Sequence, residues 1–465
     1  MDNFQPKVCV IGAGPSGLVA LRHFKGIADC VCYELKSQIG GLWVYNDTTD
    51  DTVDSSDEFY KLYNHTHESI YHDLTTIIPK WFFAYKDFPP IHEDQHLTHK
   101  QVLEYLEAYA EYFELSSYIK FNTTVLNVCL NHKYSDKKWK VTIQKDDTID
   151  VAYFDYVLVC NGHNSVPYYP TEGISGLESF KGDVMHAHNI RKPDSDEFLN
   201  KSILFVGARW SGLDLLYQFL DNKRLQGTVD FYKIYVAIGK SDHLHNSENF
   251  KPFLDSGKIV FKDGKNLKFD ENSVTFEDGT YADIDTVLFC TGYQFQFPFF
   301  SDSSLIQVKA EGKCFGPLYK RIFCINEPTL MFVGQSDNNP LIQIIMEKQV
   351  LVCKHFIDGK IQLPAKIDMT ADYEQELLDC AKYGLKNLFK GNPKSQWKYI
   401  RNLKKLLSQN DIDEYPINEE FNKALDSMID IFREFIKAGN FIDFKIFDYS
   451  RCIPDSFEYD TTKYF

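Results

Sequence analysis

Apolar positions near the start of the chain predict a strand, a turn, a helix and a second strand. Residues 8–11 form a short apolar run typical of a buried strand, and the glycine-rich stretch GAGPSG follows at 12–17. Apolar residues continue through 18–21 as in a helix, and a second apolar run at 30–33 ends at Glu34. This order of elements is typical of a mononucleotide-binding unit, whose parallel strands are joined by a helix.

The same pattern returns about 195 residues later in the chain. The apolar run SILFV at 202–206 leads into the turn GARWSG at 207–212, and helical spacing resumes over 213–220. Further strands are expected at 286–293 and 329–335. A unit that occurs twice at this distance indicates two nucleotide-binding domains rather than a solenoid repeat.

We therefore expect an α/β fold with two Rossmann-like dinucleotide-binding domains, the second inserted into the first. The first would comprise 1–165 and 325–465, with a mainly helical, polar C-terminal part from about residue 366, and the second 166–324. Within the first domain, 121–161 alternate like a small set of strands, and 98–113 form an amphipathic helix. Thr98 and Gln101 have the spacing of a capping box at the start of that helix.

The composition mainly excludes certain classes of partner and enzyme. The 465 residues include 50 Lys and Arg against 66 Asp and Glu, a net charge of −16, so bulk attraction to nucleic acid or anionic lipid is not expected. The eleven cysteines contain no C-x-x-C pair, which favours a reducing compartment and disfavours the disulfide reductases. With no signal peptide and no apolar run of about 18 residues, we expect a cytoplasmic protein without a transmembrane segment.

Other catalytic signatures are missing from the sequence. The H-x-H pairs at 65–67, 186–188 and 243–245 do not combine with cysteines at a ligand spacing, so no metal site is expected. The chain also has no G-x-S-x-G elbow or P-loop, and its one H-E-x-x-H match, HEDQH at 92–96, precedes the predicted helix of 98–113 instead of lying on a helix face. Hydrolase and nucleoside-triphosphatase functions therefore have no support.

The first glycine turn carries the strongest chemical signal. Gly12 permits the tight turn, Gly14 lets a diphosphate approach the backbone, and Gly17 lets the helix pack closely on the strand. The helix N-terminus then offers unpaired N–H groups to the phosphates. Glu34 can accept hydrogen bonds from a ribose diol.

Two further stretches leave alternatives open. In IGGLW (39–43), paired glycines beside a large aromatic fit a loop lying against a planar cofactor, or a hairpin with a core tryptophan. The second turn has Arg209 where the template has its middle glycine. That side chain would either crowd a phosphate or pair with it.

With these features together, the chain resembles the flavin-containing monooxygenases, class B flavoprotein monooxygenases of the N- or S-oxygenating type. The similarity is nearly continuous from about residue 7 to 364, and it includes ELKSQIGGLW (34–43), KDFPP (86–90), VLVCNGHNSVPYYP (157–170), FKGDVMHAHNI (180–190) and FEDGTYADIDTVLFCTGYQFQFPFF (276–300). The resemblance implies two cofactors, FAD and NADPH.

The resemblance also assigns roles to individual positions. FAD would be bound through its diphosphate by Gly12, Ala13, Gly14, Pro15, Ser16 and Gly17, and through its ribose by Glu34. Leu42 and Trp43 would line the flavin, Val125 would lie near the adenine, and Gly41 and Thr76 would also contact a cofactor. Thr76 and the position of Ile77 would be the catalytic positions. NADPH would meet Gly207, Arg209, Ser211, Gly212, Leu213, Asp214 and Lys240.

This sequence departs from the family pattern at three positions. Ile190 ends the fingerprint where the family has an aromatic residue, and Arg209 replaces a glycine. At 76–80 the chain reads TIIPK, so Ile77 stands where the family has an asparagine facing flavin and nicotinamide, unless the alignment shifts by one residue. An isoleucine cannot supply the hydrogen bonds of that amide.

Two functions follow from the resemblance. The first is an FAD- and NADPH-dependent monooxygenase of the dimethylaniline type, which transfers one oxygen atom of O2 from a flavin C4a-hydroperoxide to a soft amine or sulfur nucleophile. The second is a catalytically impaired homologue, either an NADPH oxidase or a non-catalytic FAD-bearing subunit of a larger assembly. Ile77, Ile190 and Arg209 favour the second, and members of the family suggest a homodimer.

Overall fold

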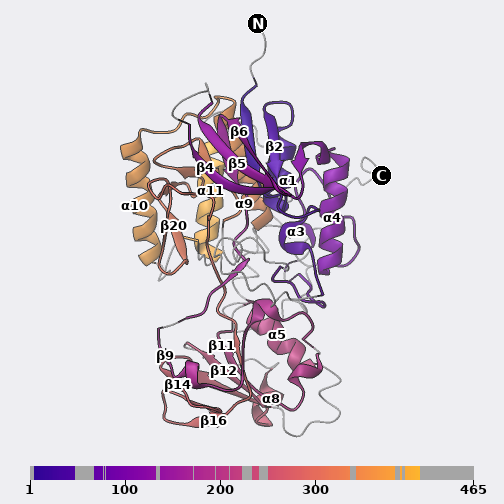
Figure 1. Ribbon diagram of the computed structural model, residues 1–465, viewed down its shortest axis with the longest axis vertical. Helices are drawn as coiled ribbons and strands as arrows, with labels where there is room; N and C mark the ends of the chain where they lie inside the picture. The colour runs from indigo at the N-terminus through magenta and orange to yellow at the C-terminus, as the bar shows by residue number, and fades with distance from the viewer. Residues whose placement is uncertain are drawn as a thin grey trace.

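Two lobes make up the part of the chain that the structure describes (Figure 1). This computed structural model describes residues 5–47, 68–76, 78, 80–131, 137–170, 172–193, 195–208, 210–221, 233–239, 250–335, 342–382, 388–389 and 393–408. The upper lobe contains segments from both ends of the described chain, and the lower lobe contains the middle of the chain.

A seven-stranded sheet forms the centre of the upper lobe. Its strands lie in the order β21 (Leu318–Tyr319), β22 (Phe323–Cys324), β23 (Leu330–Phe332), β7 (Tyr156–Val159), β1 (Lys7–Ile11), β2 (Asp29–Tyr33) and β3 (Ile119–Lys120). Strands β23 to β3 are parallel, and β21 and β22 are antiparallel to their neighbours. Strands β21 to β23 therefore belong to the same sheet as the N-terminal strands. The exact domain boundaries stay a prediction.

The first sheet is covered on both faces, which explains why β1 is almost entirely apolar. On one face Val8 and Val10 pack with helices, and on the other Cys9 and Ile11 pack with a small antiparallel sheet. The helices are α1 (Pro15–Phe24), α3 (Lys80–Phe83), α4 (His99–Tyr112), α9 (Ile342–Ile357) and α11 (Pro393–Ser408). The small sheet comprises β4 (Thr124–Leu130), β5 (Trp139–Lys145) and β6 (Thr148–Phe154).

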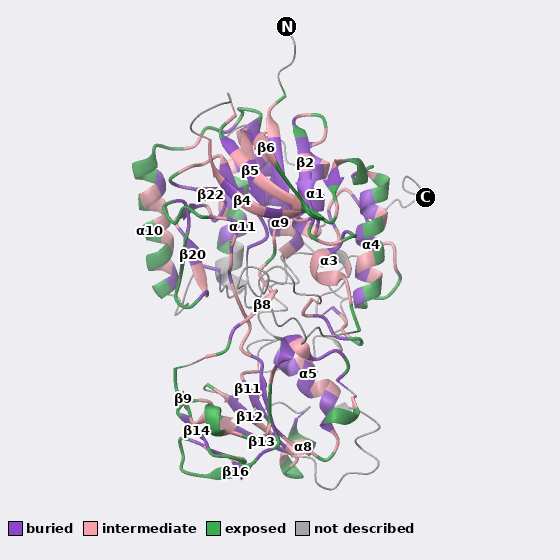
Figure 2. Ribbon diagram, viewed as in Figure 1, coloured by how far each residue is buried: buried purple, intermediate pink, exposed green. Residues whose placement is uncertain are grey.

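The lower lobe contains a five-stranded sheet in which every strand is parallel to its neighbours. Its order is β10 (Asp183–His186), β17 (Thr286–Phe289), β11 (Ser202–Val206), β12 (Lys233–Ile238) and β13 (Ile259–Asp263). Helix α5 (Trp210–Asp221) packs on one face through Leu216 and Phe219. The other face packs on a four-stranded sheet of β16 (Tyr281–Asp283), β15 (Ser273–Thr275), β14 (Leu267–Phe269) and β9 (Ile174–Ser175). Figure 2 shows the buried residues concentrated on the strands and on inward helix faces.

Shorter elements connect these layers. They are α8 (Lys251–Asp255), the paired strands β8 (Val166–Pro167) and β18 (Tyr293–Gln294), and the hairpin of β19 (Gln307–Lys309) and β20 (Cys314–Gly316). The short helical turns are η1 (Gly41–Trp43), η2 (Ser116–Tyr118), η3 (Leu177–Ser179), η4 (Ala187–Asn189) and η5 (Asp196–Phe198).

Several local predictions are confirmed. The Thr98 hydroxyl accepts from the Gln101 N–H, and the Gln101 side chain accepts from the Thr98 N–H, so the predicted capping box starts α4. Beyond residue 366 the described chain is helical in α10 (Lys366–Lys382) and α11, whereas 409–465 lie outside the described residues. In the described part of the chain, no helix has the length and apolarity needed to span a membrane.

Candidate functional site

The first glycine turn joins β1 to α1 and cannot accommodate larger side chains at two positions. Gly12 has a φ of +99°, and a Cβ there would lie 2.7 Å from the carbonyl oxygen of Cys160. A Cβ on Gly17 would lie 1.9 Å from the carbonyl oxygen of Gly12. Gly14 precedes α1 and makes no side-chain capping hydrogen bond to the N-terminus of this helix. The backbone of the turn is therefore open to a ligand and attractive to an anion.

The IGGLW stretch forms a loop that lies directly against this turn. A Cβ on Gly41 would lie 3.0 Å from the Gly14 Cα, so this close approach depends on glycine at position 41. Gly41–Trp43 form a short helical turn rather than a hairpin. Leu42 and Trp43 line the cavity described below, and the Trp43 ring meets Phe83 edge-on with centroids 5.2 Å apart. The hairpin alternative is therefore wrong, and contact of this loop with a planar cofactor stays a prediction.

Glu34 at the end of β2 is held by the backbone of the same turn. Its Oε2 accepts from the Ala13 N–H at 2.6 Å, and its Oε1 accepts from the Lys36 N–H at 2.8 Å. Burial raises the pKa of this carboxyl above its ordinary value, and the two N–H donors oppose the shift. A carboxylate offers about four acceptor positions, so two remain for a diol.

The second glycine turn reproduces the geometry of the first. Gly207 has a φ of +86°, and a Cβ there would lie 2.9 Å from the carbonyl oxygen of Cys290. A Cβ on Gly212 would lie 2.9 Å from the Cys290 Cβ and 3.2 Å from the Gly207 carbonyl oxygen. The residues facing the two turns also correspond, since Cys160 follows β7 and Cys290 follows β17. The two lobes therefore present equivalent turns, although Arg209 lies outside the described residues.

Both turns border one cavity of about 600 Å³, a volume in the usual range of ligand pockets. The predicted residues that line it are Gly12, Gly14, Pro15, Ser16, Glu34, Gly41, Leu42, Trp43, Thr76, Val125, Ser211, Gly212 and Asp214. Four others lie next to it without lining it, namely Ala13, Gly17, Gly207 and Leu213. Ile77, Arg209 and Lys240 lie outside the described residues.

Thr76, whose neighbour Ile77 is not described, is held by its own hydroxyl. The Thr76 hydroxyl donates to the Ile78 carbonyl at 2.8 Å and accepts from the Leu97 N–H at 3.0 Å. The Thr76 side chain is buried. These bonds fix the segment as part of the cavity wall.

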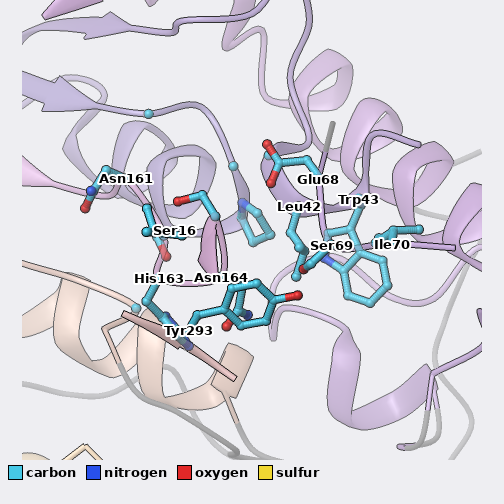
Figure 3. Close-up of a pocket in the computed structure, with 18 of the residues that line it drawn as sticks. Ser16, Leu42, Trp43, Glu68, Ser69, Ile70, Asn161, His163, Asn164 and Tyr293 are labelled. Atoms are coloured by element: carbon cyan, nitrogen blue, oxygen red, sulfur yellow. The ribbon is translucent and has the colours of Figure 1, made fainter. Parts of the chain in front are cut away.

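Sequence reasoning did not single out several residues of the cavity wall. Among them, Tyr71 donates a hydrogen bond to the carboxylate of Asp214, and Ser69 hydrogen-bonds the phenol of Tyr293. The Tyr293 ring points toward Ser69 and Leu42 in Figure 3, and His163 comes from the same side as Tyr293. A signal for His163 and Tyr293 was present, because VLVCNGH (157–163) and VLFCTGY (287–293) are equivalent stretches of the two lobes.

The fingerprint stretch is explained by packing. A Cβ on Gly182 would lie 2.4 Å from the Asp285 carbonyl oxygen, and Phe180 packs edge-on against Phe269. His186 lines the cavity, and burial lowers its pKa to about 4, so the ring is neutral at physiological pH. Ile190, which replaces the family aromatic, is buried in the lower core. That departure is therefore accommodated by the core.

These residues fit a dinucleotide cofactor. The glycine cradle, the open N-terminus of α1 and the held Glu34 offer complementary groups to a diphosphate and a ribose. No side chain can fill the cradle at Gly12 without displacing the Cys160 backbone. From the second turn and the start of its helix, Ser211, Gly212 and Asp214 line the same cavity.

Comparisons with known proteins agree with this geometry. The family described as flavin-binding monooxygenase-like matches residues 5–224 and 241–421. The chain is 30% identical to the flavin-containing monooxygenase FMO GS-OX5 of Arabidopsis thaliana, covering 78% of this chain and 76% of that one. It is also 30% identical to dimethylaniline monooxygenase [N-oxide-forming] 4 of Mus musculus, covering 79% and 72%.

A solved structure extends the similarity to the whole fold. S-allyl-L-cysteine S-oxygenase from Allium sativum superposes with a TM-score of 0.77 over 97% of both chains, at 24% identity. Two parallel sheets, two equivalent glycine turns and one shared cavity thus coincide with the sequence matches. The chain belongs to the flavin-containing monooxygenases, a family of class B flavoprotein monooxygenases.

Proposed function

We propose that this protein uses NADPH and FAD to transfer one oxygen atom from O2 to a soft nitrogen or sulfur nucleophile. The observation that carries the proposal is the single cavity bordered by both glycine turns. Two dinucleotides bound at these turns would extend into the same cavity. That arrangement is what a reaction between two cofactors needs.

The chain's own residues would bind and orient the cofactors. The first turn and Glu34 would hold the diphosphate and ribose of FAD, with Leu42 and Trp43 beside the flavin and Val125 near the adenine. Ser211, Gly212 and Asp214 would contact NADPH. When bound, FAD supplies the redox chemistry that takes up electrons from NADPH and activates O2.

The remaining walls would mainly exclude water and position the nucleophile. Phe295, Phe299 and Met346 are apolar and line the cavity, and His186 is neutral there. Apolar side chains and a neutral imidazole suit an uncharged amine or sulfur atom. One relative is named for N-oxide formation and one solved neighbour for S-oxygenation, so the proposal includes both nucleophiles.

Anaerobic mixing of the purified flavoprotein with NADPH tests the proposal. We expect NADPH to bleach the visible absorption band of the oxidised flavin. After O2 is admitted, an amine or sulfide substrate should yield an N-oxide or S-oxide in proportion to the NADPH consumed. Bleaching followed only by H2O2 release would indicate an NADPH oxidase, and no bleaching would favour the non-catalytic subunit.

Ile77→Asn tests the most important departure from the family pattern. The restored amide could hydrogen-bond bound NADP⁺ or the flavin, which an isoleucine cannot do. We expect a larger fraction of the oxidised NADPH to appear as oxygenated product and a smaller fraction as H2O2. An unchanged ratio of product to H2O2 would contradict the role assigned to this position.

A further inference from the structure

One short segment of the upper lobe makes consecutive contacts with the lower lobe. We call Ser69–His72 the bridging segment. Ser69 hydrogen-bonds the phenol of Tyr293, Tyr71 donates to the carboxylate of Asp214, and the His72 N–H donates to the Arg191 carbonyl at 2.8 Å. These contacts connect the segment to Arg191 and Asp214 of the lower lobe and to Tyr293 at the start of the connecting strand β18.

The bridging segment is also anchored on the upper lobe. The His99 N–H donates to the Leu74 carbonyl at 3.1 Å, and the Thr76 N–H donates to the Leu97 carbonyl at 2.7 Å. The His99 ring lies within hydrogen-bond distance of the His72 carbonyl, at 3.0 Å. Since Leu97 and His99 flank the capped start of α4, the segment is fixed to a stable helix. Movement of the lower lobe would therefore strain these contacts.

Of these three contacts, the one made by Tyr71 is the most buried. Its side chain is 2% exposed and packs in the core of the lower lobe with Ile190 and Leu213, although its backbone belongs to the upper-lobe anchor. Burial and the neighbouring Asp214 carboxylate raise the pKa of this phenol well above its ordinary value, so it stays a donor. Hydrogen bonds to a carboxylate are stronger than neutral ones.

Asp214 links this contact to the second glycine turn. It lies in α5 two residues after Gly212, and both it and Tyr71 line the cavity. The Asp214 carboxylate also lies 3.2 Å from the Gln218 side-chain amide, one helical turn along α5. The Tyr71 phenol therefore holds the helix end that borders the proposed NADPH site.

We propose that Tyr71 is a positioning residue, which holds Asp214 and the N-terminal turn of α5 in register with the upper lobe. This inference rests on the proposed function, because it concerns the transfer of a hydride from NADPH to FAD. Hydride transfer requires the reacting atoms to be about 3–3.5 Å apart, so a small rotation between the lobes has a large effect on its rate. The Tyr71–Asp214 bond limits that rotation.

Tyr71→Phe tests the proposal in the FAD-loaded protein. The ring remains and only the donor is lost. At saturating NADPH we expect the anaerobic rate of flavin reduction to fall at least about tenfold, with the FAD content unchanged. The control is Tyr399→Phe, which removes a buried phenol that donates to the Lys320 carbonyl and accepts from the Gln349 side-chain amide; neither Tyr399 nor Gln349 lines the cavity. That control should reduce flavin within about twofold of the wild-type rate.

Asp214→Asn provides a second variant that retains the size of the side chain. If Tyr71 acts through Asp214, each single change should slow flavin reduction and the double variant should be no slower than the slower single variant. If the fold-loss of rate in the double variant equals the product of the two single losses, the proposal is contradicted.

Amide hydrogen exchange provides a readout that does not depend on turnover. In Tyr71→Phe, exchange should accelerate in peptides covering 69–74 and 207–216, and in Tyr399→Phe it should not. Unchanged exchange in Tyr71→Phe, or an unchanged limiting rate of flavin reduction, overturns the positioning role. If NADPH does not bleach the flavin band of the wild-type protein, the proposed function is refuted instead. The exchange measurement then decides whether the bridging contact exists.

Discussion

Glycine is required at corresponding residues of the two lobes by steric constraints. Gly12 and Gly207 both have positive φ, and both lie against the carbonyl oxygen of a cysteine that follows a neighbouring strand. The glycines that follow, Gly17 and Gly212, pack against the carbonyl oxygens of Gly12 and Gly207. The spacing of these glycines therefore reflects close contact between backbone segments as well as access for a ligand.

Gly12→Ala should destabilise the protein and reduce its FAD content. The left-handed φ costs about 1–2 kcal/mol for an alanine, and displacing the Cys160 carbonyl adds about 1–3 kcal/mol. Gly26→Ala is a matched control, because Gly26 has a φ of +86° with no atom within 4 Å of the added Cβ. The measurements are melting temperature and bound flavin per chain. Equal losses in the two variants would show that the Cys160 contact is unimportant.

Because of Glu34, the affinity for FAD should begin to fall at a higher pH than it would with an ordinary glutamate. Burial raises the pKa of Glu34, and the ionised form is the better acceptor for a ribose diol. Affinity should therefore be constant above this raised pKa and fall as the pH is lowered through it. Flavin fluorescence during titration of the apoprotein with FAD at a series of pH values measures the effect.

Glu34→Gln is the control for this pH dependence. The variant should bind FAD more weakly at neutral pH by about 1.5–3 kcal/mol, the usual contribution of hydrogen bonds to a charged group. Its affinity should not change over the pH range in which the wild type loses FAD. A variant that keeps the wild-type pH profile would assign the titration to another group.

Helix α4 shows how a local element supports the cavity wall. Its capping box places Thr98 beside Thr75, with which it forms an isolated bridge in the backbone. The wall residue Thr76 is bonded to Leu97 just before the cap. The start of α4 therefore stabilises both the helix and the segment that carries Thr76.

Thr98→Ala should lower the stability of the protein by about 1 kcal/mol, the usual cost of losing an N-cap side chain. Ser117→Ala, beyond the other end of α4, is the control, because that hydroxyl is exposed and bonded only to Glu114 at 3.4 Å. Urea unfolding followed by circular dichroism measures both. If the control loses as much stability as Thr98→Ala, the loss cannot be assigned to the cap of α4.

At the scale of the whole molecule, the cavity is built from segments far apart in the chain. Ser16 and Met346 both line it, as do Val125 and Asp214, so cofactor binding and folding are coupled. A ligand that binds only the folded state stabilises it by an amount set by its concentration and affinity.

FAD should therefore protect the protein against thermal unfolding. At a concentration 100 times its dissociation constant, FAD should add about 2.7 kcal/mol to the stability of the apoprotein. Scanning fluorimetry with and without FAD measures the shift. Riboflavin is the control, since it lacks the diphosphate and adenosine that the first turn and Glu34 would hold. An equal shift with riboflavin at the same concentration would contradict the proposed mode of binding.

The two strand–turn–helix units and the start of α4 were predictable from the sequence, because their signals are local. Gly17 packs on the Gly12 carbonyl and Gly212 on the Gly207 carbonyl within one turn, and Thr98 forms its capping box with the nearby Gln101. The family also followed from such motifs, which carry the resemblance to flavin-containing monooxygenases. In each case the physical cause is backbone geometry over one or two turns of chain.

The tertiary structure alone decided which residues meet across the two lobes. The bond of Tyr71 to Asp214, the contact of Ser69 with Tyr293 and the burial of Ile190 join positions that no local pattern connects. The shared cavity depends on the relative placement of two sheets, which is determined by packing over the whole chain. Apolar packing is not directional, so such pairings can be read only from the folded molecule.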